Sequence, residues 1–505
     1  MATSDVASPH AMGATPLPRL VGAAIALAAA LAWPAPGQAI DQRKPAGQAR
    51  TWYVDNTAAP DGDGSMVAPF DRLARAERAA DAGDTIYVFR GDGTARGLDA
   101  GIRLRPYQRL VGSGAPLLIE GEAPLPAGER PLLSAASGPA VVLADHVRVE
   151  GLTIGGAEGV GIAGDGVGDA WLAGLRVDGA LRLRDPRGVV RVESTDLRAR
   201  GAAALAVAST HGEGRVELDG VTLAGAGGTD DGLSLRAGGD AALTVAVAST
   251  VLEGIAGNGF ALAADGHGRL RLEVAGSGLV GELPAGTAAA LAAVAREDGI
   301  VEVRARGNDL PAREAAVLLS ANGRGRLRVE LLANVVGGPG AARGVVLLLG
   351  DAGEAALTLD GNRIAGQRGE AVYAVVAAQS SLGIAARDND LADGAALGGG
   401  PFPALLVEGR DTGRACLTLA DNRFAGGAGP APSAVLRQRD ASALAVGGYS
   451  PAAAGDLTQR LAANNRIGRA EVESDRPLAD PAGSSCVPLP PPQPAVAAAT
   501  ASPAT

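Results

Sequence analysis

The chain has 505 residues and a net charge of −10; aromatic residues make up only 3% of it, while glycine occurs 74 times. This charge, with no Lys/Arg-rich tract to neutralise phosphates, argues against nucleic acid as a partner. So few large rings also exclude a globular core built around aromatic side chains. What remains is a core of Val, Leu, Ile and Ala, which suits a narrow and repetitive architecture.

The first 39 residues are predicted to be an export signal, followed by a linker over residues 40–50. Arg19 precedes an apolar run from Val21 to Trp33, and Gly37-Gln38-Ala39 is typical of a small-residue cleavage site. The run is short for a membrane span, so we expect cleavage, with a retained N-terminal anchor as the alternative. The mature protein is then expected to be secreted, at the cell surface or in the periplasm, without an integral membrane domain.

One pattern recurs from about residue 145 to 470. It consists of an apolar residue, any residue and a second apolar residue, then four further residues, and then another apolar residue that is usually followed closely by glycine. VRVEGLTIGG, LRVELLANVVGG and LTLDGNRIAG are examples. Alternation with a period of two indicates strands. Most repeats lie roughly 20 to 31 residues apart, the length of one turn of a parallel β-helix. We therefore predict an all-β, right-handed, single-stranded parallel β-helix of about twelve coils.

Asparagine occupies one position of the repeat, two residues before its last apolar residue, throughout the last six coils. The asparagines are Asn308, Asn334, Asn362, Asn389, Asn422 and Asn465. We expect asparagine there because a tight bend between two strands needs a residue that tolerates the left-handed region. Stacked one coil apart, the amides can hydrogen-bond to one another. A row of ligand-binding amides is the alternative; we predict a structural ladder.

These features resemble the pectate-lyase-like superfamily of right-handed parallel β-helices. The segment from Trp52 to Gly114 is similar to the opening of many secreted bacterial β-helix proteins, with a strand, a Gly/Asp-rich loop, Pro-Phe, a short helix and Gly-Asp-Thr-Ile-Tyr-Val. The helix, expected at about 71–82, turns Leu73, Ala76 and Ala80 onto one face that can cover the end of the apolar column. The resemblance covers about residues 52 to 470 and is specific for the fold, not for an activity.

The organisation predicted from these patterns has three parts after the linker. Residues 51–144 form the cap and first coils, residues 145–476 form the β-helix repeats, and residues 477–505 form a Pro/Ala-rich tail that cannot bury a core. Cys416 lies in the repeats and Cys486 in the tail. In an exported chain these two could form a disulfide that pins the tail to the last coils, or remain two thiols.

The resemblance to the pectate-lyase-like superfamily implies a set of candidate catalytic residues. Its polygalacturonase-like members use Asp pairs, a Gly-His-Gly and a basic residue on one face, and this chain contains Asp196, the pair Asp230-Asp231, and His267 between two glycines. Their positions relative to the repeat put them at three different phases around the coil, so convergence on one substrate is not expected. We interpret them as turn residues and predict no catalytic set; they are the candidates if the protein is an enzyme.

Acidic turn residues recur after the second strand of several coils, and a weak Ca²⁺-binding edge is one interpretation of them. These residues are Asp240, Asp265, Asp298, Asp351, Asp411 and Asp440. Solvated turn carboxylates are the preferred interpretation, because each Asp also suits an Asx turn. No metal and no other cofactor is predicted.

The function predicted from the sequence is that of an exported, non-enzymatic β-helix scaffold used for adhesion or surface display. Its expected partners are a polysaccharide or a ligand on a host or cell surface. The alternative is a polysaccharide lyase or glycoside hydrolase of the same fold. A filament built by end-to-end stacking is a third hypothesis, which a cap helix and a tail argue against.

Overall fold

The computed structural model describes residues 49–118, 124–225, 230–280, 288–392, 402–425, 432–449, 456–474, 476–479 and 486. The chain divides into residues 1–37 and 38–505, and all described residues belong to the second unit. The predicted signal at 1–39 and nearly all of the predicted tail at 477–505 lie outside the described residues. No helix within the described ranges has the length and apolar character needed to cross a membrane.

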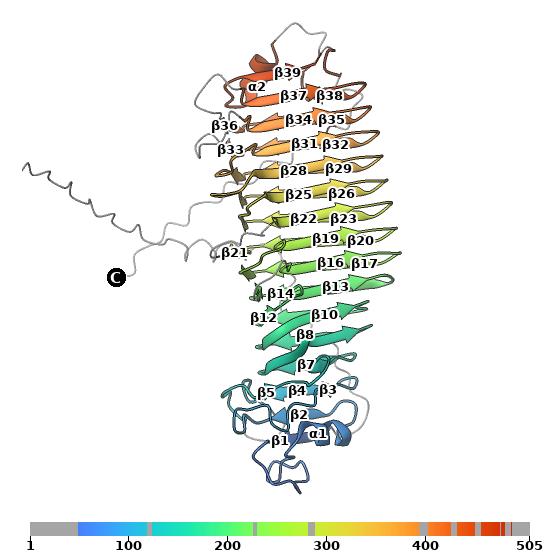
Figure 1. Cartoon of the computed structure of the whole chain (residues 1–505), viewed down its shortest axis with the longest axis vertical. Helices are drawn as coiled ribbons and strands as arrows, with labels where there is room; N and C mark the ends of the chain where they lie inside the picture. Colours follow the sequence, from blue (N-terminus) through green and yellow to red (C-terminus); the bar gives the residue numbers. More distant parts are fainter. Residues whose placement is uncertain are drawn as a thin grey trace, which may run out of the picture. The chain divides into compact units, whose positions relative to one another are not determined.

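The described chain is an all-β parallel β-helix, which confirms the predicted fold of about twelve coils. Figure 1 shows the coils stacked in chain order, from the blue N-terminal end to the red β39. One coil consists of β29 (Glu354–Asp360), β30 (Arg363–Ile364) and β31 (Val372–Val376). The chain then enters β32 (Ser381–Arg387), which pairs in parallel with β29 and begins the next coil.

Three parallel sheets therefore run the length of the unit, each built from one strand per coil. The first sheet contains 15 strands: β1 (Thr51–Val54), β2 (Thr85–Val88), β4 (Arg109–Gly112), β7 (Val147–Glu150), β9 (Ala170–Ala173), β11 (Val189–Glu193), β14 (Glu213–Asp219), β17 (Ala242–Ala248), β20 (Arg269–Ala275), β23 (Ile300–Arg306), β26 (Arg326–Leu332), β29, β32, β35 (Arg414–Ala420) and β38 (Ala443–Val446).

The second sheet consists of short strands that follow the tight bend after each first-sheet strand. They are β5 (Leu132–Leu133), β12 (Asp196–Ala199), β15 (Thr222–Gly225), β18 (Val251–Glu253), β21 (Gly278–Val280), β24 (Asp309–Leu310), β27 (Val335–Val336), β30, β33 (Asp390–Ala392) and β36 (Arg423–Ala425). The long strands β8 (Thr153–Asp165) and β10 (Arg176–Arg184) contribute to both the second and the third sheet.

The third sheet closes each coil. Its strands are β3 (Ile102–Arg103), β6 (Val141–Val142), β13 (Leu205–Ser209), β16 (Leu233–Ala237), β19 (Phe260–Ala264), β22 (Ala289–Ala295), β25 (Ala315–Ala321), β28 (Arg343–Leu349), β31, β34 (Leu405–Gly409), β37 (Ala434–Gln438) and β39 (Ala470–Glu473), with parts of β8 and β10.

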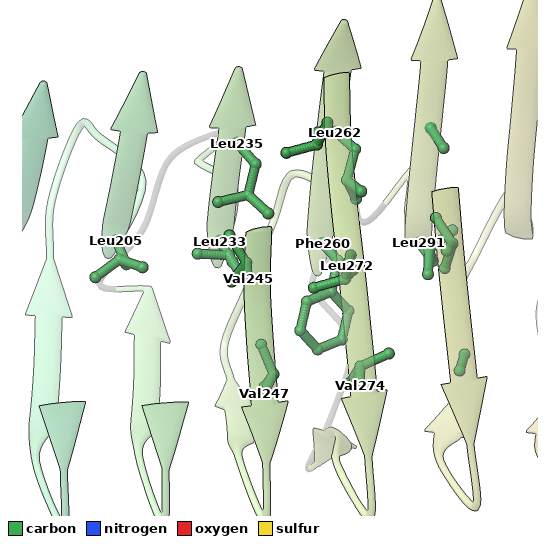
Figure 2. Close-up of a cluster of buried hydrophobic side chains, with 14 of the residues drawn as sticks. Leu205, Leu233, Leu235, Val245, Val247, Phe260, Leu262, Leu272, Val274 and Leu291 are labelled. Atoms are coloured by element: carbon green, nitrogen blue, oxygen red, sulfur yellow. The ribbon is translucent and has the colours of Figure 1, made fainter. Parts of the chain in front are cut away.

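The core is a column of aliphatic side chains stacked coil on coil. In Figure 2, Leu233 and Phe260 come from neighbouring strands of the third sheet, and Val245 and Leu272 come from neighbouring strands of the first. All four are buried. Because strand side chains alternate between the two faces, every second residue enters this column and the others form the outer faces.

Helices close both ends of the column. At the N-terminal end α1 (Leu73–Ala79), slightly shorter than predicted, buries Leu73 and Ala76 in the core. At the other end α2 (Leu457–Asn464), which the sequence analysis did not predict, buries Leu457 and Leu461. Apolar ends that would otherwise meet water are thereby covered, as terminal repeats require.

The asparagines form a continuous hydrogen-bonded ladder at the bend between the first and second sheets. The backbone N–H and the side-chain Nδ2 of Asn334 both donate to Oδ1 of Asn362, at 2.9 and 3.0 Å. Asn362 donates in the same way to Asn389, both at 2.9 Å, and its Nδ2 also donates to the carbonyl of Leu331 at 2.7 Å. The ladder therefore satisfies buried backbone groups from one coil to the next.

The predicted reason for asparagine at this bend is wrong. No ladder asparagine has a positive φ; the residue before each of the first five does, at Gly307, Ala333, Gly361, Asp388 and Asp421. Asn465, the last of the ladder, has a φ of −146°. The preceding residue thus supplies the left-handed turn, and the asparagine supplies the hydrogen bonds.

Replacing Asn362 by leucine is expected to lower the free energy of unfolding by about 1–3 kcal/mol, because the backbone groups that its amide satisfies lose their partners. Urea unfolding followed by circular dichroism measures this. Asn322→Leu is the control: this asparagine lies outside the ladder, with its Nδ2 bonded to the Ser320 hydroxyl. Equal unfolding curves for the two variants would contradict the ladder's structural role.

The residue before the asparagine offers a second, independent test. Ala333 has a φ of 53°, so Ala333→Gly should raise the free energy of unfolding by about 0.5–1 kcal/mol through relief of left-handed strain. Gly361 has a φ of 64°, and a Cβ added there would meet open space, so Gly361→Ala should lower the free energy of unfolding by a similar amount. Thermal unfolding midpoints that move in the same direction for both variants would refute this account.

Candidate functional site

The outer faces of the first and third sheets differ in charge. Outward residues of the first sheet form ion pairs within and between coils, for example Arg271 with Glu273 at 2.6 Å and Arg304 with Glu330 at 3.5 Å. The third sheet has a long uncharged stretch instead. Alternating charges keep the outer face of the first sheet solvated. The uncharged stretch of the third sheet lacks such charges, so we consider its outer face as the candidate functional site.

Two rows of outward residues run along the third sheet, in register from β10 to β39. Row 1 is Arg182, Ala206, Ser234, Ala261, Ala292, Leu318, Val346, Tyr373, Leu406, Val435 and Glu471. Row 2 is Arg184, Ala208, Arg236, Ala263, Val294, Ser320, Leu348, Val375, Glu408, Arg437 and Glu473.

The rows divide into three zones. The strands β10 and β16 carry exposed arginines, with two outward alanines on β13 between them, and β34 and β39 carry glutamates, with an arginine on β37 between them. Between them, the ten outward positions of β19, β22, β25, β28 and β31 hold no charge. Arg343, at the start of β28, lies over the ring of Tyr373, 4.4 Å from its centroid, and pairs with Glu370 at 2.7 Å.

A hollow of about 390 Å³ lies in the arginine zone, and we call it the arginine hollow. Ala206 and Ala208 form its floor, and Arg182, Arg184 and Arg236 stand around it. No carboxylate of the described residues comes within 4.0 Å of these three guanidinium groups. Unpaired guanidinium groups above a floor of small side chains can hold an anionic group by bidentate hydrogen bonds.

Asp230 and Asp231 line one edge of the arginine hollow. Oδ1 of Asp231 accepts hydrogen bonds from the backbone N–H and the Nδ2 of Asn258, at 2.7 and 3.0 Å. Oδ2 of Asp230 is buried, with no hydrogen-bond partner among the described residues. Asp231 therefore stabilises the turn at Asn258 in the neighbouring coil by hydrogen bonds. The Oδ2 atom of Asp230 makes no such hydrogen bond among the described residues.

The other two candidates lie at different edges of the coil. Asp196 begins β12 in the second sheet, where it is in register with Arg176 and Thr222. His267 lies at the corner between the third and first sheets, with 79% of its side chain exposed and Nδ1 4.0 Å from a carboxylate oxygen of Asp298. The Asp230-Asp231 pair precedes a third-sheet strand and His267 follows the next one, so a five-residue strand, roughly 16 Å, separates them. The structure does not bring the candidates into one site.

The acidic turn residues form a second ladder that sequence reasoning missed. At the corner between the third and first sheets, the carboxylates of Asp351, Asp411 and Asp440 accept the backbone N–H groups of Gly323, Ala378 and Asp411, one coil earlier, at 3.0, 3.0 and 3.1 Å. The carboxylates therefore link coils rather than being merely solvated. A hydrogen bond from Arg324 lowers the pKa of the neighbouring Asp298. Within the described ranges, no group of three His, Cys, Asp or Glu side chains could hold a metal ion.

Both cysteines lie within the described residues, and the structure joins Cys416 to Cys486 by a disulfide, with 4.8 Å between their Cα atoms. Cys416 is an outward residue of β35 that is nonetheless fully buried. Near this bond, Leu478 packs into the core, and the backbone N–H of Ala479 donates to the carbonyl of Leu444 at 2.7 Å. Leu478 and Ala479 thus cover part of the last coil.

Comparisons with known proteins give little beyond this geometry. No protein-family model matches the chain, and no curated protein matches it. Two crystal structures of the GH136 lacto-N-biosidase from Eubacterium ramulus are similar, the native protein at 10% identity and the selenomethionine derivative at 11%. Each match covers 84% of this chain and 68% of that chain, with TM-scores of 0.27 and 0.29. A likeness this low carries no argument about activity.

The two aspartates at the hollow provide a matched pair for mutation. Asp231→Ala is expected to lower the free energy of unfolding by about 1–2 kcal/mol, because two donors of Asn258 lose their acceptor. Asp230→Ala should change it by less than about 0.5 kcal/mol. Chemical unfolding of the two variants beside the parent protein measures both values. A larger loss for Asp230→Ala would show that this carboxylate, and not Asp231, holds the turn.

Proposed function

We propose that the protein is an exported, non-enzymatic β-helix scaffold that binds a partner through the outer face of its third sheet. The observation that supports this best is the run of ten uncharged outward positions on β19 to β31, whereas the first-sheet strands β20, β23 and β26 of the same coils carry charged outward residues. Contiguous apolar surface on an otherwise charged protein is typical of an interaction site. Export itself rests on the signal-like sequence of the first 39 residues.

The positions of the acidic and histidine candidates argue against catalysis. A glycoside hydrolase needs two carboxyl groups on either side of one bond, within about 10 Å of each other. General acid–base chemistry likewise needs its groups within hydrogen-bond reach of one substrate. Asp196 and His267 lie at other edges of the coil than the pair Asp230-Asp231, and Asp231 is engaged with Asn258.

A second candidate function is a polysaccharide lyase or glycoside hydrolase that works at the arginine hollow. The hollow favours it, because it combines three unpaired guanidinium groups with two neighbouring carboxylates. Arginines suit the carboxylates of an acidic polysaccharide, and aspartates suit sugar hydroxyls. Membership of the pectate-lyase-like superfamily would be consistent with either function, since one fold can host unrelated activities.

Incubation of the purified protein with polygalacturonate, alginate and a set of neutral polysaccharides separates the two functions. Reducing ends and the ultraviolet absorbance of unsaturated products are measured, with Ca²⁺ and with EDTA. We expect no product above the level of a heat-denatured control. Product that disappears in both Asp230→Asn and Arg236→Ala would replace the scaffold by an enzyme acting at the hollow.

A further inference from the structure

We propose that the partner of the third sheet is a second copy of this chain, packed face to face and antiparallel, with a two-fold axis along the strand β25. The inference rests on the proposed function, because it names the partner for the face assigned there. Three independent properties of the outward rows support it: the sizes of the side chains, the order of the charges, and the length of the face.

The apolar zone is flat and partly exposed. Strands β19 to β31 pair in parallel without shifting the outward rows, and Figure 1 shows them stacked almost parallel along the unit. Leu348, on β28, is 42% exposed. A flat sheet is usually stabilised by another sheet stacked on it, about 10 Å away. A partner with a flat apolar face of its own fits this zone best.

Side-chain sizes along row 1 are complementary to the same row read backwards. A two-fold axis along β25 brings each strand opposite the strand that is equally far from β25 on the other side. Small residues of the first half then lie opposite large residues of the second half of the other copy: Ala206 with Val435, Ser234 with Leu406, Ala261 with Tyr373, and Ala292 with Val346. Val346, Leu406 and Val435 are already buried within one chain, whereas Ala261 and Tyr373 are both partly exposed, so the contact centres on the Ala261–Tyr373 pair. Alternating large and small residues across an interface lets the side chains interdigitate.

Charges follow the same symmetry. Arg236 lies three coils before β25 and Glu408 three coils after it, both in row 2, so the axis places them opposite each other. Five coils away, the arginines of β10 meet the glutamates of β39, namely Arg182 with Glu471 and Arg184 with Glu473. Opposite charges at facing positions fix the register of an interface and disfavour other arrangements.

The alternative two-fold axis, along the length of the β-helix, fails this charge test. It would bring each coil opposite the same coil of the other copy, so Arg182 would face Arg184 and Glu471 would face Glu473. Facing like charges are costly when water is excluded. The antiparallel arrangement is therefore the one that the residue order supports.

The glutamates of β34 and β39 also pair with arginines of their own chain. Glu408 accepts a hydrogen bond from Nε of Arg410 at 2.7 Å, and Glu473 accepts one from Nε of Arg437 at 2.6 Å. Arg437 lies four coils after β25, so in the dimer it faces the alanine floor of the arginine hollow, where there is room for a long side chain. Oδ2 of Asp230, at the edge of the hollow, has no hydrogen-bond partner among the described residues and is available to the guanidinium group of Arg437.

The face is large enough for a stable dimer. Eleven strands spaced about 4.8 Å apart, each presenting about five residues of 3.3 Å, give roughly 50 by 16 Å. This is on the order of 800 Å² for each partner, the size of a standard protein–protein interface.

The mass of the purified protein in solution tests the partner. Light scattering after size-exclusion chromatography should give about twice the mass of one chain at micromolar concentration. Leu348→Glu should weaken the dimer at least about tenfold, because it places a charge in the apolar zone. Val335→Glu is the matched control, since Val335 is 50% exposed but lies on the second sheet, and it should leave the mass unchanged.

A cross-link tests the register. Ser320 lies on the proposed axis, so two copies of a Ser320→Cys variant should be joined by a short bismaleimide, whereas Thr358→Cys on the first sheet should not. Circular dichroism confirms that each variant is folded. A monomeric parent protein, a dimer insensitive to Leu348→Glu, or the absence of the Ser320 cross-link would each overturn the inference.

These outcomes are separate from those of the proposed function. A monomer that degrades none of the polysaccharides would remove the second copy as partner and leave the scaffold standing. Degradation that depends on Asp230 and Arg236 would remove the scaffold, whatever the mass.

Discussion

Hydrogen bonding between backbones one coil apart is the constraint on which the whole structure depends. A parallel pair satisfies its N–H and C=O groups only when each residue keeps its partner in the next coil. Because the chain must then turn three times in every coil without losing register, left-handed residues recur at two of the three corners. The Asn ladder at one of these corners and the carboxylate ladder at the other carry the same inter-coil bonding through places where strands cannot.

Much of this was predictable from residue patterns, because the aliphatic alternation of the first sheet repeats with little variation. The left-handed positions were assigned to the wrong residue for a physical reason. Glycine, alanine, serine and aspartate all occupy them, since the stacked neighbours enforce the conformation whatever the side chain. The helix α2 escaped prediction because it is short, and only Leu457 and Leu461 mark its buried face.

The candidate site was less predictable. The distance between repeats varies, so the residues that face each other on the third sheet cannot be matched by counting along the chain. Only the paired strands show that Arg236 is two coils from Arg184, or that Leu348 belongs to an uncharged row. The acidic residues were identified as recurrent, but their hydrogen bonds to the preceding coil depend on the corner geometry, which the pattern does not specify.

The outward rows have a consequence for how this chain can change in evolution. A solenoid usually gains or loses coils easily, since each repeat contacts only its neighbours. Here a coil inserted between β25 and β34 would move Glu408 and the glutamates of β39 one step along, while the arginines of β10 and β16 stayed in place. The glutamates beyond the insertion would then no longer lie opposite the arginines of the other copy. A face that is complementary to its own reverse thus fixes the number of coils, which the core alone would leave free.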